Sequence, residues 1–134
     1  MIVVLMSSYN ICDMPLVHIR YQSTVEADVL KRIIPALHQA VADQLCCDDQ
    51  PEQFKVTPEM VKIRFTQAHP LDTHMSDIFI EIEGRAFKSR MGKEEVFAAE
   101  IGKAVAPLLP GSVRYSVWVK LCHAGWHAGL GSGE

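Results

Sequence analysis

Four runs of alternating apolar and polar residues predict four β-strands. The runs are residues 15–21, 61–66, 78–83 and 113–121. In the first, Val17 and Ile19 alternate with His18 and Arg20. A two-residue period is typical of a strand with one face buried and the other exposed. We therefore expect each strand to bury one set of side chains.

Two stretches with helical spacing lie between these strands. The first covers about 25–47, and its apolar residues recur every three or four positions: Val29, Leu30, Ile33, Leu37, Ala40, Val41 and Leu45. The second runs from about Lys93 to Leu109 and ends at Pro110-Gly111. Such spacing predicts two amphipathic helices. The segment Ser23-Thr24-Val25-Glu26 is typical of a capping box at the start of the first helix.

The element order is β-α-β twice, which predicts an α+β fold. Right-handed crossovers through a helix make the two strands of each unit parallel. We expect a four-stranded mixed sheet with both helices on one face. The residues predicted to be buried beneath the helices are Val17, Ile19, Val61, Ile63, Ile80, Ile82, Val117 and Val119.

The opposite face of this sheet is predicted to carry charges of both signs. Its members are His18, Arg20, Lys62, Arg64, Glu81, Glu83, Arg114 and Lys120. Such a face is either simply solvated, as in many sheets with one wet side, or pairs with another subunit. Both explanations remain open on the sequence.

Length and composition are those of one globular domain. The 134 residues are 49% hydrophobic and 22% charged, with a formal net charge of −3, so no basic field attracts nucleic acid. No stretch approaches the ~20 apolar residues that span a bilayer, and the apolar start lacks the features of a signal peptide. Four cysteines could form a disulfide framework, but their density is far below that of small disulfide-stapled secreted domains. We expect a reduced cytoplasmic protein without membrane or nucleic-acid partners.

The segment that starts with Met14-Pro15 resembles a known family. Residues 15–21, the first helix and residues 58–66 are similar to the opening half of tautomerases such as oxalocrotonate tautomerase and carboxymethyl-hydroxymuconate isomerase, and residues 78–85 with their helix repeat the plan. The tautomerase superfamily also includes proteins like macrophage migration inhibitory factor. The resemblance covers residues 14–121, leaving an extension at 1–13, expected to be non-native or disordered, and a C-terminal tail at 122–134.

The resemblance implies a catalytic role for Pro15. In the family, the secondary amine of an N-terminal proline moves a proton between carbon and oxygen of an enol or keto acid. Fourteen residues precede Pro15 here, and acylation by Met14 leaves its nitrogen without a basic lone pair. Either translation starts at Met14 and this methionine is removed, or Pro15 does not act as the base. In a purely structural role, Pro15 begins an edge strand.

Basic residues supply the candidate substrate contacts. The resemblance places Lys62 where family members carry an arginine that holds a substrate carboxylate, and lysine keeps the charge without the bidentate geometry. The arginine that oxalocrotonate tautomerase carries after its first strand is missing, since this chain reads Ser23-Thr24-Val25. Arg64, Arg85 and Arg90 are substitutes, although each is ordinarily a solvated or ion-paired surface residue.

Histidines and cysteines form a rival set of candidates. Cys122, His123 and His127 lie close in sequence, but their spacing is not that of a paired metal-ligand motif. His69 and His74 flank Asp72 in a loop, where histidine is usually a turn residue. We therefore expect neither a metal nor a cofactor.

The sequence leaves two main functions open. The first is a tautomerase or isomerase that acts on a small anionic enol or keto acid; the second is a binding or scaffold protein of the same fold. The element order also matches RNA-binding ferredoxin-like domains, but their aromatic signature on the open face is absent. The resemblance further implies a homo-oligomer, with a closed trimer favoured.

Overall fold

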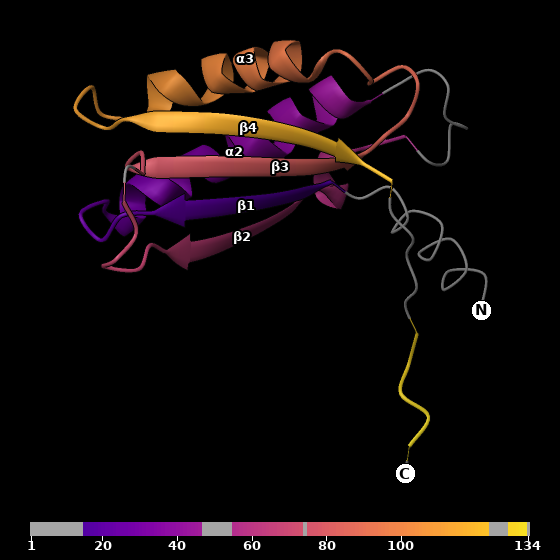
Figure 1. Ribbon diagram of the computed structural model, residues 1–134, viewed down its shortest axis with the longest axis horizontal. Helices are drawn as coiled ribbons and strands as arrows, with labels where there is room; N and C mark the ends of the chain where they lie inside the picture. Colours follow the sequence, from indigo (N-terminus) through magenta and orange to yellow (C-terminus); the bar gives the residue numbers. More distant parts are fainter. Residues whose placement is uncertain (1–14, 47–54, 74, 124–128, 134) are drawn as a thin grey trace.

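The computed structural model describes residues 15–46, 55–73, 75–123 and 129–133. Its elements in chain order are β1 (Leu16–Tyr21), α2 (Ala27–Leu45), the short 3-10 helix η2 (Pro58–Met60), β2 (Lys62–Gln67), β3 (Ile78–Arg85), α3 (Glu94–Val105), the 3-10 helix η3 (Ala106–Leu108) and β4 (Tyr115–Cys122). Figure 1 shows both α-helices on the same side of the sheet. The predicted α+β fold is confirmed.

The four strands form one mixed sheet in the order β2-β1-β3-β4. Strand β1 runs parallel to β2, β3 runs parallel to β4, and the two central strands β1 and β3 are antiparallel. Each β-α-β unit therefore forms a parallel pair, as the crossover rule requires. The antiparallel centre places the starts of β1 and β2 at one end of the sheet and the starts of β3 and β4 at the other (Figure 1).

The core lies between the sheet and the helices. Of the residues predicted to be buried, Val17, Ile19, Val61, Ile80 and Ile82 are buried. The other three, Ile63, Val117 and Val119, are partly buried and pack against this core. They belong to β2 and β4, the edge strands, which receive less cover than the centre. Full burial of one such side chain stabilises the fold by about 1.5 to 3 kcal/mol.

The first helix begins later than the sequence indicates. Its N-cap is Glu26, whose side chain makes no capping hydrogen bond, and the helix starts at Ala27. The predicted capping box is therefore wrong. Residues 22–25 are drawn into a turn in which the amide of Val25 donates to the carbonyl of Gln22 at 3.0 Å. Burial of the apolar face, rather than a side-chain cap, holds this helix in place.

Some expectations fall on parts of the chain outside the described residues. These are the extension at 1–13, Met14, His74, and His127 in the tail. Within the described part, β4 continues to Cys122, and residues 129–133 have no regular secondary structure. None of the described helices is both long enough and apolar enough to cross a membrane.

Candidate functional site

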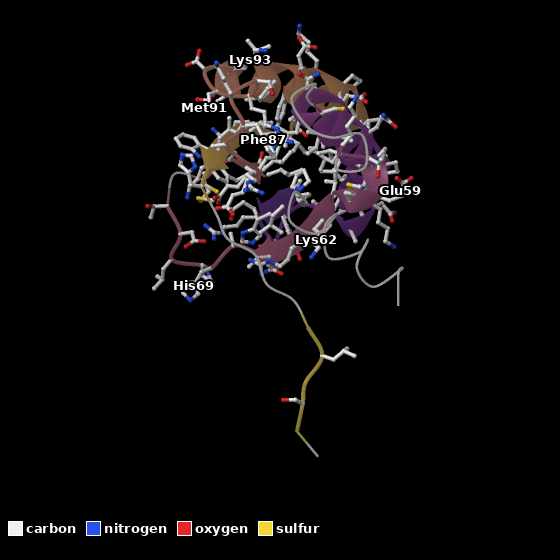
Figure 2. The ribbon with its side chains drawn as sticks, turned by 90° about the vertical axis from the view of Figure 1, so that its right-hand side faces the viewer. Glu59, Lys62, His69, Phe87, Met91 and Lys93 are labelled. Atoms are coloured by element: carbon white, nitrogen blue, oxygen red, sulfur yellow. The ribbon has the colours of Figure 1, made fainter. Side chains whose placement is uncertain are left out.

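One end of the sheet collects most of the predicted site residues. Strands β1 and β2 begin there, and β3 and β4 end there, because the register pairs Leu16 with both Lys62 and Glu83. Figure 2 looks onto this end, with Lys62 in its lower part and Phe87 above it. Pro15, Lys62 and Arg85 all lie here although they are far apart in sequence. Arg64 lies two residues farther along β2.

Pro15 is buried at the start of β1. Its carbonyl oxygen accepts a hydrogen bond of 3.0 Å from the amide of Lys62, which ties the first residues of β1 and β2 together. By the alternation of β1, Pro15 shares the helix-facing side with Val17. Strand β1 lies in the centre of the sheet, so the expectation that Pro15 begins an edge strand is wrong. Proline is tolerated here because it stands at the very start of the strand, directly before Leu16. The backbone thus fixes Pro15 at a defined and enclosed position.

Lys62 is exposed on the open face of the sheet, beside Leu16. The segment that leads into it is anchored to α2, because the Nδ1–H of His38 donates to the carbonyl of Pro58 at 2.9 Å. Hydrogen bonds from its own backbone amide and from the Thr57 side chain hold the pKa of the neighbouring Glu59 below its usual value of 4.5. The turn before β2 is therefore well ordered by local contacts, and it sets the position of Lys62.

Arg64 lies in a region of mixed charge. It pairs with His18 across the β1–β2 ladder. A small cavity of about 100 Å³ on the open face is lined by Arg64, His18, Leu16, Glu81 and Glu83. The carboxylates of Glu81 and Glu83 in this lining repel an anion and so offset the attraction of Arg64. This cavity is consequently a poorer anion site than the presence of an arginine alone indicates.

Arg85 is exposed at the last position of β3, paired with Cys122 of β4. Its guanidinium carbon lies 5.4 Å from the centre of the Phe87 ring. A cation over an aromatic face is held by the ring quadrupole, with about 0.5 to 1 kcal/mol at exposed sites. The Arg85 side chain is thus steadied near the Pro15 end while it remains open to solvent.

Arg90 is the residue whose surroundings the sequence did not reveal. We expected a surface side chain, yet it is only 1% exposed, so this expectation is wrong. Its Nε and Nη2 donate to the carbonyl of Leu45, and its Nη1 donates to the carbonyl of Arg85 at 2.9 Å. Its guanidinium carbon also lies 4.8 Å from the centre of the Phe87 ring. The burial is tolerated because carbonyls at the end of α2 and in β3 replace water.

Arg90 also lies close to the position of Pro15. A Cβ atom added to Gly84 would be 3.8 Å from Nη1 of Arg90. If the register that pairs Leu16 with Glu83 is continued by one residue, Gly84 faces Pro15 across the β1–β3 ladder. The guanidinium therefore lies beneath the end of the sheet that carries Pro15. No sequence signal marks this, because Arg90 belongs to an irregular segment between β3 and α3.

Among the described residues, the rival histidines and cysteines have local partners or no partner that suggests chemistry. His69 and Asp72 are joined within one turn: the Asp72 carboxylate accepts from the His69 amide at 2.9 Å, and His69 Nδ1 accepts from the Leu71 amide at 3.0 Å. Cys46 and Cys122 are unpaired thiols. Across the described ranges, no group of three or more histidine, cysteine or acidic side chains is placed to hold a metal ion.

Comparison with known proteins finds similarity at the level of structure. No protein-family model matches the chain, and no curated protein matches it by sequence. A fused 4-OT solved as a wild-type symmetric trimer is similar with a TM-score of 0.58 and 14% identity, over 86% of this chain and 94% of that one. The MIF2 of Leishmania major is similar with a TM-score of 0.52 and 16% identity, over 86% and 95% of the two chains.

A malonate semialdehyde decarboxylase is also similar, with a TM-score of 0.51 and 19% identity over 87% of this chain and 91% of that chain. All three neighbours have the tautomerase-superfamily fold. The fold that the Met14-Pro15 resemblance implied is therefore confirmed. At these identities the likeness shows the fold and leaves activity to be argued from the residues.

Proposed function

We propose that this chain, when it begins at Pro15, is a tautomerase-like enzyme that interconverts the keto and enol forms of a small anionic acid. The observation that carries the proposal is the placement of Pro15: it is buried at the start of β1, and its carbonyl is bonded to the amide of Lys62. A general base must lie within hydrogen-bond reach of the proton that it takes in the bound substrate. The backbone bond to Lys62 supports the proposal because it holds the nitrogen-bearing residue and a basic residue at the same end of the sheet.

The chemistry follows from the free amine. An α-amino group has a pKa of about 7.7 to 8.0, and burial disfavours its charged form. The neutral nitrogen of Pro15 takes the proton from the enol hydroxyl. The resulting ammonium returns a proton to the other carbon of the enol double bond, the one that does not carry the oxygen. The enol becomes the ketone and the amine is regenerated. In the chain that includes residues 1–14, this nitrogen is a tertiary amide, so the reaction requires the removal of these residues.

Lys62 and Arg85 hold the substrate carboxylate in this proposal. Both are exposed and lie at the Pro15 end. Arg85 presents a planar fork that suits a carboxylate, while Lys62 contributes a point charge. We assign Arg64 a weaker part, because Glu81 and Glu83 line its cavity.

The test compares two forms of the protein. One is expressed from Met14, with mass spectrometry to verify that it begins at Pro15; the other is the full 134-residue chain. The first form should accelerate ketonisation of the enol of phenylpyruvate, and the second should not. Pro15→Ala in the short form removes the cyclic secondary amine and should reduce the rate. Equal rates from all three proteins would exclude Pro15 from the mechanism.

A scaffold or binding function remains the second candidate, and one observation favours it. The two carboxylates beside Arg64 reduce the attraction of the open face for anions. A scaffold would bind its partner without needing the free amine of Pro15. Absence of any rate enhancement from the form that begins at Pro15, together with normal folding, would favour this candidate.

We also infer that the chain assembles as a homo-trimer through the open face of the sheet. Trp118 is 59% exposed on that face. A hollow of about 290 Å³ beside it is lined by Trp118, Phe79, Met75, Arg20 and Glu81. Aromatic residues and arginine are enriched in protein interfaces. The fused 4-OT of the same fold is itself a trimer, which supports this arrangement.

A further inference from the structure

The far end of the sheet carries a cleft that the proposed reaction does not use. Its volume is about 640 Å³, and its lining residues are Met75, Ser76, Val113, Arg114 and Tyr115. These residues lie just before β3 and at the start of β4. In Figure 1 both strands start at the left, opposite the starts of β1 and β2. Sites for small molecules commonly have about 300 to 1,000 Å³.

The internal repeat of the fold relates this cleft to the Pro15 end. Exchange of β1 with β3 and of β2 with β4 reproduces the strand order and the parallel pairings. In the first unit, Lys62 begins β2 beside the start of β1. In the second unit, Arg114 immediately precedes β4, beside the start of β3, and its carbonyl accepts from the amide of Ile78 at 3.0 Å. Each unit therefore has a basic residue at the start of its second strand.

The backbone of Arg114 is fixed while its side chain faces solvent. Its amide donates to Oδ2 of Asp77 at 2.8 Å, so this carboxylate binds the backbone and is absent from the cleft lining. Within the described ranges, no side-chain bond or ion pair occupies the Arg114 guanidinium. Of the described residues that line the cleft, Arg114 carries the only charged group.

The rest of the lining defines what a ligand must look like. Met75, Val113 and the ring of Tyr115 give an apolar wall. The Tyr115 hydroxyl donates to the Gly102 carbonyl at 3.4 Å, so it is not offered to a ligand. The hydroxyl oxygens of Ser76 and Ser116 are 2.7 Å apart and form one hydrogen bond. The hydroxyl that accepts this bond keeps its own proton, which it can donate to a ligand.

We propose that this cleft is a second binding site, for a small carboxylate with a flat apolar body. The carboxylate lies against the guanidinium of Arg114, whose planar fork matches it bidentately. With Ser116 as the donor within its pair, the Ser76 hydroxyl keeps its own proton for the ligand, and the apolar body packs against Met75, Val113 and Tyr115. Nothing in this site requires a free amine at Pro15, so loss of the proposed tautomerase activity leaves the site unaffected.

The experiment is a titration of the full chain with benzoate, followed by amide chemical shifts in ¹⁵N-labelled protein. The amides of Ser76, Arg114 and Tyr115 should shift and saturate. Arg114→Gln should weaken this binding about tenfold, as expected for loss of one charged hydrogen-bonding partner. Arg32→Gln, which removes an exposed arginine of α2, should leave it unchanged. Benzamide, which has the same shape without the charge, should bind far more weakly.

Further arms separate this site from the Pro15 end. Lys62→Gln should leave the shifts at Ser76 and Arg114 intact, even if it removes shifts near Leu16. The proposal is overturned if benzoate moves only amides at the Pro15 end, or if Arg114→Gln binds as tightly as the parent protein. It is also overturned if benzamide binds as well as benzoate, since the guanidinium would then play no part.

Discussion

The guanidinium of Arg90 closes the end of helix α2 by donating from two of its nitrogens to the carbonyl of Leu45, the last residue of that helix. The last carbonyls of an α-helix have no partner within the helix, and a buried one needs a donor from elsewhere. A residue from the segment between β3 and α3 provides it. One side chain thereby joins the two β-α-β units beneath the Pro15 end of the sheet.

Replacement of the buried Arg90 should destabilise the fold far more than replacement of an exposed arginine. Arg90→Lys cannot bond the carbonyls of Leu45 and Arg85 together, and a buried group left unsatisfied costs about 1 to 3 kcal/mol. We expect the free energy of unfolding in urea to fall by that amount. Arg85→Gln, at an exposed position, is the matched control and should change it by less than about 0.5 kcal/mol. A loss below 0.5 kcal/mol for Arg90→Lys would contradict the bridging role.

Gly84 should resist enlargement because three groups surround it. An added Cβ would meet Leu45 Cδ1 at 3.2 Å and Leu121 Cδ2 at 3.4 Å. Overpacking of this kind typically costs about 1 to 3 kcal/mol. We expect Gly84→Val to lower the thermal midpoint clearly and Gly84→Ala to lower it less. Gly111→Ala is the control, since nothing lies within 4 Å of its added Cβ; equal midpoints for the Gly84 and Gly111 variants would show that the site can expand.

Removal of the charge of Lys62 or Arg85 should slow catalysis, whereas removal of a cation far from Pro15 should not. In the form that begins at Pro15, Lys62→Gln and Arg85→Gln should each lower kcat/KM for the enol of phenylpyruvate about tenfold, because each removes a charged hydrogen bond to the carboxylate. Lys103→Gln serves as control, since Lys103 lies on α3 and pairs with Glu100 at 2.9 Å. An unchanged kcat/KM in both site variants would remove these cations from the substrate site.

Glu59 should make a small contribution to stability that depends on pH. Its pKa is lowered in the folded protein, so the contribution is present above the usual value of 4.5 and is lost as the pH falls through the lowered folded value. The difference in urea midpoint between the parent and Glu59→Gln should therefore shrink between pH 6 and pH 3. Glu95→Gln, an exposed carboxylate of α3, controls for the loss of one charge. A difference that grows on acidification would give the opposite sign and refute the assignment.

The open face should control assembly. Trp118→Asp places a charge at the exposed aromatic of β4 and should convert a trimer into monomers in light scattering at micromolar concentration. Leu71→Asp, in a loop where the leucine is 81% exposed, should leave the mass unchanged. High salt should loosen the trimer if charged pairs dominate the contact. A parent protein that is already monomeric would remove the trimer from the proposed function.

The sequence by itself determined the strands, the helices and the two faces of the sheet. A strand has a period of two, so the alternation around Val17 and Ile80 identified which residues are buried, and the β-α-β order determined the parallel pairs. These features depend on local spacing and chain order, both of which can be read from the sequence. The family resemblance added Pro15, Lys62 and Arg85 as candidate site residues, but it did not place them at one end of the sheet.

Only the tertiary structure decided what depends on contacts between distant segments. Arg90 reads as a surface residue because its partner Leu45 is 45 positions away, and no local pattern encodes that meeting. The acidic pair beside Arg64 becomes relevant only once β1, β2 and β3 are aligned. Likewise, Ser76 and Arg114 come together because the starts of β3 and β4 meet at one end of the sheet. Periodicity reports which way a side chain faces, whereas the packing of strands and helices decides which other side chains it meets.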